Sequence, residues 1–318
     1  MELGRVAAEL QGPLRKVPPT PFNSALGRWA INAAIGLIPA IATEGVEMRR
    51  VAGTTRGLRV HVPLVRKSKG ALLWIHGGGY IIGSPVLDDR LCGATARKLG
   101  IPVIAASYRL APKHSFPAPL DDCFAAWRWV QDHASDLGID AKRVAVGGQS
   151  AGGGLAAGLI QRIQDRDGPD AAAQWLFSPM LDDRTAARRD LDAAGNFVWS
   201  NRQNALGWSA YLAAEPGGRD LPDYASPARR SGLEGLPPAW IGVGELDLFL
   251  DENRAYADRL RAAGIDVVID TIPGAPHGFE SWAYDTAIAQ DFIKSAQAWL
   301  EKALDQPETA AGGNHERH

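Results

Sequence analysis

A serine framed by glycines is the residue of this sequence best suited to chemistry. Residues 148–152 read Gly-Gln-Ser-Ala-Gly, a G-x-S-x-G pattern centred on Ser150, between the apolar run 144–147 and the alanine-rich run 155–160. This order predicts a buried strand, a sharp turn and a helix, and glycine neighbours allow the strained backbone that such a turn requires. A glycine-rich turn with an ordinary serine is the alternative interpretation, so Ser150 needs partners elsewhere in the chain.

A serine hydroxyl becomes a nucleophile only with a base within hydrogen-bond reach and an acid that orients the base. Among seven histidines, His277 lies on a loop rich in glycine and proline directly after the last predicted strand. This is the sheet edge where Ser150 also lies, and open α/β sheets place their sites there. Asp247 directly follows the preceding predicted strand. We therefore predict Ser150 as nucleophile, His277 as base and Asp247 as acid, with Glu245 or Asp251 as alternatives for the acid.

A third motif is suited to binding a negatively charged oxygen. Residues 76–79 read His-Gly-Gly-Gly directly after the apolar run 71–75. Backbone N–H groups of glycines approach a carbonyl oxygen without side-chain obstruction, and the N–H of Ala151 is a further candidate donor. We interpret His76 as a residue that orients this loop, not as the general base.

The elements that must position these residues alternate along the chain. Apolar runs predict strands, and helical patterns separate them. The alternation predicts a mostly parallel, doubly wound α/β sheet flanked by helices, with antiparallel edge strands between residues 47 and 65. The predicted buried strands are residues 71–75, 103–106, 144–147, 175–177, 239–243 and 267–270, and the predicted helices are residues 88–99, 120–134, a helix from 151, 252–263 and 285–304.

Two segments lie outside this alternation. Residues 1–46 predict two helices, and the second, about residues 23–37, is so apolar that one of its faces should be covered. A membrane-surface anchor is the alternative, although the segment lacks the basic polar face of interfacial helices. Residues 183–228 predict an inserted helical piece. The α/β core then comprises residues 47–182 and 229–304, and residues 305–318 form a polar, flexible tail.

Composition restricts the class of protein. The 318 residues carry a formal net charge of −2, which offers no electrostatic argument for a nucleic-acid partner. Cys92 and Cys123 have no metal or redox spacing, so we expect free buried thiols in a reducing cytoplasm. The N-terminus lacks a secretory pattern, and the apolar run 29–43 is too short to span a bilayer. We therefore predict a cytoplasmic protein without stable membrane insertion.

Four motifs together resemble the hormone-sensitive-lipase-like esterases, bacterial family IV. They are His-Gly-Gly-Gly at 76–79, Tyr-Arg-Leu-Ala-Pro at 108–112, Gly-Gln-Ser-Ala-Gly-Gly at 148–153 and Pro-His-Gly-Phe at 276–279. The resemblance implies an α/β-hydrolase fold with a helical cap, built from residues 1–46 and 183–228. It also implies hydrolysis of carboxylic esters through an acyl-serine, without metal or cofactor.

The same resemblance assigns residues to roles. Ser150, Asp247 and His277 occur in the chain order of the α/β-hydrolase triad, and the resemblance places Gly78, Gly79 and Ala151 in the oxyanion hole. The sequence departs from the family pattern at Gln149, where many relatives have aspartate, and at Lys113, where glutamate is common. Neither departure is at a triad position, so they affect the surroundings of the substrate.

These observations predict a serine carboxylesterase for short- to medium-chain esters. We expect its small-molecule ester substrate to lie in an apolar pocket lined by Tyr80, Trp199 and Trp208. An amidase, lactonase or deacetylase with the same triad remains an alternative, as does a lipase acting at a lipid interface. A non-catalytic small-molecule receptor on the same scaffold is disfavoured because His277 is present. A homodimer is a further expectation.

Overall fold

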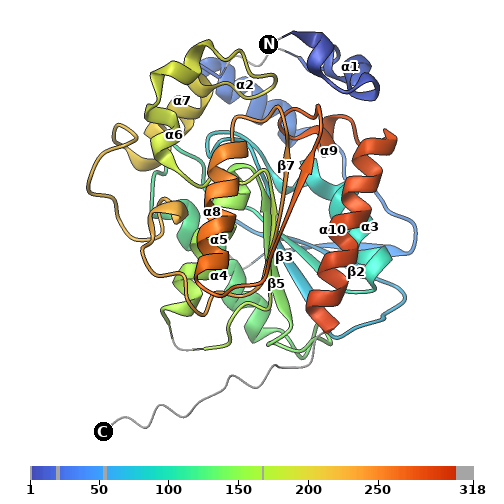
Figure 1. Ribbon diagram of the computed structural model, residues 1–318. Helices are drawn as coiled ribbons and strands as arrows, with labels where there is room; N and C mark the ends of the chain where they lie inside the picture. Colours follow the sequence, from blue (N-terminus) through green and yellow to red (C-terminus); the bar gives the residue numbers. More distant parts are fainter. Residues whose placement is uncertain (1, 19–21, 53–55, 167, 306–318) are drawn as a thin grey trace, which may run out of the picture.

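One eight-stranded sheet runs through the molecule in the computed structural model, which describes residues 2–18, 22–52, 56–166 and 168–305 (Figure 1). The strand order is β1-β2-β4-β3-β5-β6-β7-β8, and all neighbouring strands from β4 to β8 are parallel. The predicted mostly parallel α/β sheet is therefore confirmed. The strands are β1 (Val46–Val51), β2 (Leu58–Pro63), β3 (Ala71–Ile75), β4 (Val103–Ala106), β5 (Val144–Gln149), β6 (Gln174–Phe177), β7 (Ala239–Gly244) and β8 (Val267–Ile272).

The antiparallel strands differ in part from the prediction. β1 lies at the edge of the sheet, whereas β2 pairs with both β1 and β4. Most residues of β2 are buried: α3 packs against this strand, and β4 pairs with its second edge. Only one of the two predicted edge strands is therefore at the edge.

Helices cover both faces of the sheet (Figure 1). One face carries α4 (Ala118–Asp132), α5 (Ala151–Gln164) and α8 (Leu250–Ala262), and the other carries α3 (Asp89–Leu99) and α10 (Ala287–Asp305). Two separate clusters of buried apolar side chains correspond to these faces. The strands between them are continuous apolar runs because both of their faces are covered.

A layer of further helices lies over the carboxyl edge of the sheet (Figure 1). It consists of α1 (Ala8–Leu14), α2 (Ala25–Gly36), α6 (Asp183–Ala187) and α7 (Asn201–Leu212), which we call the upper layer. A capping box starts α7: Ser200 accepts from the Gln203 backbone, and the Gln203 side chain accepts from the Ser200 N–H. Phe197 and Trp199 precede this helix in a non-helical part of the segment 183–228, which was predicted to be helical.

Helix α2 buries less than its composition predicts. Ser24 caps it by accepting from the Gly27 N–H, and Ile35 is its only buried residue. Leu26, Trp29 and Leu37 are 75, 68 and 85% exposed. The predicted covered face is present, because Arg28, Ile31, Asn32 and Ile35 on one side of the helix are buried or half-buried, and Asn32 donates to the Ile81 carbonyl. Leu26 and Trp29 lie outside this face.

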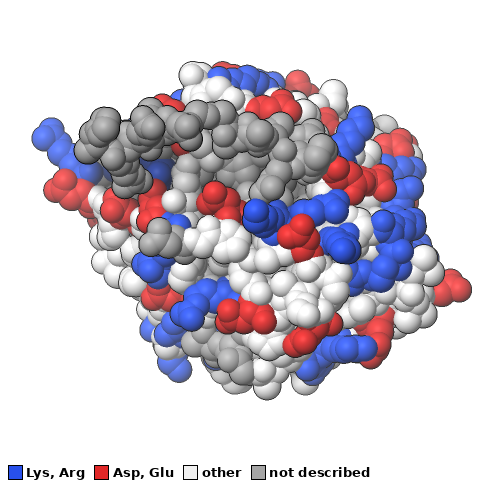
Figure 2. All heavy atoms as spheres, turned by 90° about the horizontal axis from the view of Figure 1, so that it is seen from below, with Lys and Arg blue, Asp and Glu red and all other residues white. Residues whose placement is uncertain are grey.

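The surface and the cysteines agree with the composition. Seen from below, basic and acidic side chains are interspersed over the described part of that face, as a formal charge of −2 suggests (Figure 2). Cys92 and Cys123 are both free and buried, as predicted. Within the described ranges, no helix has the length and apolar character needed to cross a membrane. The predicted tail beyond residue 305 lies outside the described residues.

Candidate active site

Ser150 lies on the sharp turn between β5 and α5. Its backbone has φ 54° and ψ −120°, a conformation that costs a non-glycine residue free energy. The Ser150 N–H donates to the Phe177 carbonyl of β6 at 2.8 Å, which anchors the turn to the neighbouring strand. A side chain on Gly152 would place its Cβ 2.1 Å from the carbonyl oxygen of Ile75. The glycine at this position is therefore required for the close approach of β3 to the turn.

His277 connects Ser150 to a carboxylate. The distance between His277 Nε2 and Ser150 Oγ is 3.0 Å, and that between His277 Nδ1 and Asp247 Oδ2 is 2.8 Å. Because a carboxylate only accepts hydrogen bonds, Nδ1 carries the proton and Nε2 is free to accept from the serine hydroxyl. The second oxygen of Asp247 accepts from the Phe249 N–H at 2.9 Å.

The structure selects among the predicted acids. Asp247 lies in the loop between β7 and α8 and reaches the imidazole, whereas the Glu245 carboxylate accepts from the Gly274 N–H at 2.9 Å. Asp251 is exposed in the first turn of α8. Neither alternative is bonded to His277.

The surroundings of His277 favour its protonated form. Burial alone would lower the pKa of this imidazole, but the charge and the hydrogen bond of Asp247, together with the charge of Glu280, raise the pKa above its ordinary value. The Phe249 and His277 rings form a T-shaped pair with their centroids 5.2 Å apart, and the indole N–H of Trp282 donates to the His277 carbonyl at 2.9 Å. The ring is thus held from several sides while its Nε2 faces the serine.

The loop that follows β3 is ordered by His76. This side chain is buried, which lowers the pKa of His76 to about 4. Its Nδ1 donates to the Gly77 carbonyl at 2.8 Å, and its ring stacks on Tyr108 at 4.2 Å. The Tyr108 hydroxyl donates to the His76 carbonyl at 3.0 Å. A neutral, enclosed His76 agrees with the prediction that it orients the loop.

Three backbone N–H groups of the predicted oxyanion hole lie at this end of the sheet. Gly78 and Gly79 line the same hollow as Ser150, and Ala151 is the first residue of α5. In the described part of the chain, none of the three N–H groups donates to a protein acceptor. They are available as donors to a bound molecule.

A hollow of about 760 Å³ opens over Ser150 between the sheet and the upper layer. Its walls are mainly apolar. Trp199, which is 5% exposed, contacts Phe22 edge to face at 5.5 Å. The lining includes Leu3, Leu14, Val17, Phe22, Phe197, Val198, Trp199 and Trp282, with the polar residues Gln149, Asn196, Gln203 and Ser281 and the charged residue Arg15.

Two of the three predicted pocket residues do not line this hollow. Tyr80 stacks on Tyr211 at 4.0 Å, and its hydroxyl donates to the Met180 carbonyl at 3.3 Å. Trp208 is fully buried beside Tyr80 at 5.4 Å. Both rings fill the core between the 76–80 loop and α7, so only Trp199 is at the predicted place.

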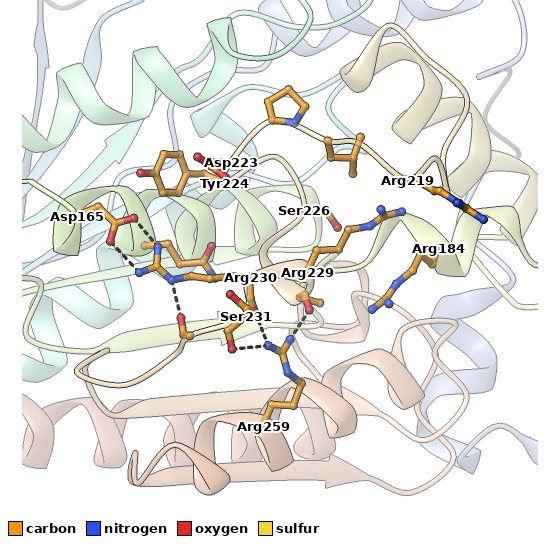
Figure 3. Close-up of a pocket in the computed structure, with 15 residues that line it drawn as sticks. Asp165, Arg184, Arg219, Asp223, Tyr224, Ser226, Arg229, Arg230, Ser231 and Arg259 are labelled. Atoms are coloured by element: carbon orange, nitrogen blue, oxygen red, sulfur yellow. Dashed lines mark hydrogen bonds and ion pairs between the residues drawn. The ribbon is translucent and has the colours of Figure 1, made fainter.

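A second hollow, of about 900 Å³, lies between α5, α8 and residues 219–232 (Figure 3). Five arginines line it, but most of them are directed at partners of the protein itself. Figure 3 shows Arg230 directed at Asp165, which it contacts with two hydrogen bonds, and Arg259 directed at backbone carbonyls. Arg229 pairs with the buried Asp183 at 2.6 Å. These contacts hold the loop to the body, and no nucleophile–base pair is among the lining residues.

Sequence reasoning missed several residues around Ser150. Leu14, Val17 and Phe22 of the N-terminal segment line the hollow, which no local pattern indicated. Glu280 and Gln149 form a partly buried hydrogen bond beside Ser150 and His277. The available signal was the position of Glu280 three residues after His277, on the short helix α9 (Phe279–Trp282).

A Ser–His–Asp arrangement at the carboxyl ends of a mostly parallel sheet defines the class of α/β hydrolases. The family model described as alpha/beta hydrolase fold matches residues 72–281. The carboxylesterase NlhH of Mycobacterium tuberculosis is 34% identical over 248 residues, 76% of each chain. An ethyl acetate hydrolase of Pseudomonas putida is 38% identical over 216 residues, 66% of this chain and 65% of the relative.

Solved structures agree with this comparison. A bacterial heroin esterase has a TM-score of 0.87 at 34% identity, with 96% of this chain and 99% of that chain covered. The esterase LipW of Mycobacterium marinum has a TM-score of 0.86 at 31% identity, with 96 and 98% covered. The chain belongs to the α/β-hydrolase family of hormone-sensitive-lipase-like proteins.

Proposed function

We propose that this protein is a serine carboxylesterase in which Ser150, His277 and Asp247 form the catalytic triad. The observation that carries the proposal is the continuous chain of contacts, 3.0 Å from Ser150 Oγ to His277 Nε2 and 2.8 Å from His277 Nδ1 to Asp247 Oδ2. The names of the similar proteins, carboxylesterase and ethyl acetate hydrolase among them, support esters as the substrate class.

In the acylation step, Ser150 Oγ attacks the ester carbonyl carbon while His277 Nε2 takes the hydroxyl proton. The carbonyl oxygen becomes an oxyanion, and the N–H groups of Gly78, Gly79 and Ala151 are the proposed donors to it. Each such donor contributes about 3–4 kcal/mol to transition-state stabilisation. The charge of Asp247 stabilises the imidazolium that forms. When the ester C–O bond breaks, His277 returns the proton to the leaving alcohol.

Deacylation repeats these steps with water. His277 Nε2 accepts a proton from a water molecule, whose oxygen attacks the acyl carbon bound to Ser150. The acid is released, and the proton returns to Ser150 Oγ. The residues of the chain supply every proton acceptor that this sequence of steps requires.

The hollow over Ser150 supports short- to medium-chain esters as substrates. A volume of about 760 Å³ is in the range of sites for small molecules, and its apolar walls suit a hydrocarbon group. Trp199 and Phe22 are the proposed contacts of this group. The cytoplasmic location, the homodimer and the role of the upper layer as a cap stay predictions.

The test is hydrolysis of p-nitrophenyl esters from acetate to palmitate by the wild type, Ser150→Ala and Ser295→Ala. Ser295 is an exposed serine on α10 and serves as the matched control. We expect activity that is highest with short chains, is lost in Ser150→Ala and is unchanged in Ser295→Ala. Folded wild type that hydrolyses no ester in the series would overturn the proposal. Turnover of anilides or lactones in place of esters would indicate the related triad hydrolases.

A further inference from the structure

A buried carboxylate lies beside the triad without a part in the steps above. Glu280 is on α9, three residues after His277, and is 2% exposed. Its Oε1 accepts from Gln149 Nε2 at 2.5 Å. Its Oε2 is buried and has no hydrogen-bond partner among the described residues. Burial of a carboxylate oxygen without a hydrogen-bond partner costs free energy. A carboxylate that is kept in such a place beside a reactive histidine is therefore a candidate for a functional role.

Gln149 connects this carboxylate to the nucleophile. It is the last residue of β5 and directly precedes Ser150. Its Nε2 also donates to Ser281 Oγ at 2.8 Å. On its other side, a Cβ added to Gly77 would lie 3.1 Å from Gln149 Oε1. The Gln149 side chain therefore lies between the loop after β3 and helix α9, which follows the histidine loop.

We propose that Gln149 and Glu280 form a brace between the nucleophile turn and the histidine loop, and that Glu280 is a second carboxylate stabilising the imidazolium of His277. The proposal rests on the proposed triad function. Glu280 is thus a positioning residue that acts through His277, and Gln149 positions Glu280. The contact joins residues 131 positions apart in the chain, so it fixes the relative placement of two segments that no covalent geometry holds together.

The charged groups around the two side chains define the electrostatics. His277 faces Asp247 from the loop after β7 and Glu280 from α9. Glu280 in turn faces Gln149, His277, Asp247 and Asp88. Burial raises the pKa of Asp88 to about 7, opposed by the hydrogen bond from Trp74. Asp88 is therefore about half protonated near neutral pH and largely protonated at lower pH, where it competes little with Glu280 for positive charge.

Contacts determine how much charge Glu280 carries. Burial raises the pKa of Glu280, while its own backbone N–H, the Gln149 amide and the neighbouring His277 oppose that rise. The Gln149 hydrogen bond thus favours the ionised carboxylate, and the ionised carboxylate favours the imidazolium. The brace and the charge of Glu280 both depend on the hydrogen bond between Gln149 and Glu280. Substitutions are therefore needed to separate the two effects.

Glu280→Gln removes the charge and keeps an acceptor for the Gln149 amide. His277 must be neutral to act as a base, so activity falls as pH decreases through the pKa of His277. Loss of a nearby negative charge lowers that pKa, and we expect the acid limb of kcat/KM to move to lower pH. The matched control is Glu252→Gln. Glu252 is a buried glutamate that accepts from the Leu181 and Asp182 N–H groups and does not contact the triad. We expect its acid limb to stay in place.

Gln149→Leu removes the brace, and Glu280→Leu removes both brace and charge. We expect kcat to fall about tenfold in each variant with little change in KM, because transition-state alignment is lost while the apolar walls remain. If the two residues act as a unit, the double variant loses no more activity than Glu280→Leu alone. Thermal unfolding of each variant identifies any general loss of structure.

Reaction of Ser150 with an organophosphate ester separates this proposal from the proposed function. Its rate reports on the serine–histidine pair without requiring turnover of any carboxylic ester. An acid limb of phosphorylation that shifts to lower pH in Glu280→Gln supports the proposal even if the preferred substrate is not an ester. An unshifted limb in Glu280→Gln overturns the charge role, and losses that multiply in the double variant overturn the brace. Absence of any phosphorylation in the wild type would count against the triad itself.

Discussion

Gly79→Ala tests how the proposed oxyanion hole and the wall of the hollow fit together. Gly79 has φ +58°, and an added Cβ would lie 2.3 Å from Trp199 Cη2 and 2.9 Å from Trp199 Cζ2. The left-handed backbone costs alanine ~1–2 kcal/mol. The Trp199 ring must also move by more than 1 Å to reach a normal carbon–carbon separation of about 3.5–4 Å. Its contact with Phe22 resists this movement.

Overpacking of this kind costs ~1–3 kcal/mol, so the free energy of unfolding should fall by about 2–5 kcal/mol in total. If the movement also displaces the Gly79 N–H, kcat should fall by a factor of roughly 10²–10³, the effect of losing one oxyanion donor. Urea unfolding and kcat with p-nitrophenyl acetate measure the two effects separately.

Two further variants separate backbone strain from steric overlap. Gly138→Ala is the matched control, because Gly138 has φ +62° and no atom within 4 Å of an added Cβ. It should lose only the ~1–2 kcal/mol of backbone strain and keep full activity. In a Trp199→Leu background, Gly79→Ala should cost about 1–3 kcal/mol less than in the wild type. Equal costs of Gly79→Ala in both backgrounds would refute the argument from the Trp199 contact.

Two other substitutions test the site and the upper layer. Asp247→Asn should lower kcat/KM by a factor of about 10³–10⁴ because the imidazole loses its orienting acceptor. Because Asp247 raises the pKa of His277, the residual activity should show an acid limb at lower pH, whereas an unshifted limb in the pH profile would contradict this coupling. Trp29→Gln should change the free energy of unfolding by less than about 0.5 kcal/mol in urea, since the ring is 68% exposed. A larger loss would mean that Trp29 is covered after all.

Much of the fold was predictable because its signals are local. The predicted strand 71–75 coincides with β3, and 103–106 coincides with β4, since a buried parallel strand needs a continuous apolar run. Ser150 and His277 were predictable for a similar reason: each lies in the segment that follows a strand, among small residues that allow an irregular backbone. The 3.0 Å distance between their side chains is a property of the fold that the motifs only suggested.

The errors involve contacts between distant segments. Tyr80 directly follows the 76–79 motif, and Trp208 lies in the predicted helical insertion. Both rings pack against each other in the core and do not line the hollow. Aromatic composition does not determine which face of a loop or helix is covered. Helix α2 shows the opposite case, in which the apolar side chains of Leu26 and Trp29 stay exposed. The Gln149–Glu280 contact was not predictable, because no local sequence pattern around either residue indicates the other as its partner.

The register of the sheet explains why separate motifs meet at one site. Neighbouring parallel strands are aligned so that they end at a common edge, as the pairs Ile75–Gly148, Gln149–Phe177, Phe177–Gly242 and Gly244–Ile272 record. The loop 76–79 with the proposed oxyanion donors, Ser150, Asp247 and His277 each follow their strand by only a few residues. A short offset from a shared edge keeps all four within one hollow. Side-chain contacts such as that between Gln149 and Glu280 then adjust the relative positions of these residues by only a few ångströms. Proton transfer depends on positioning at this scale.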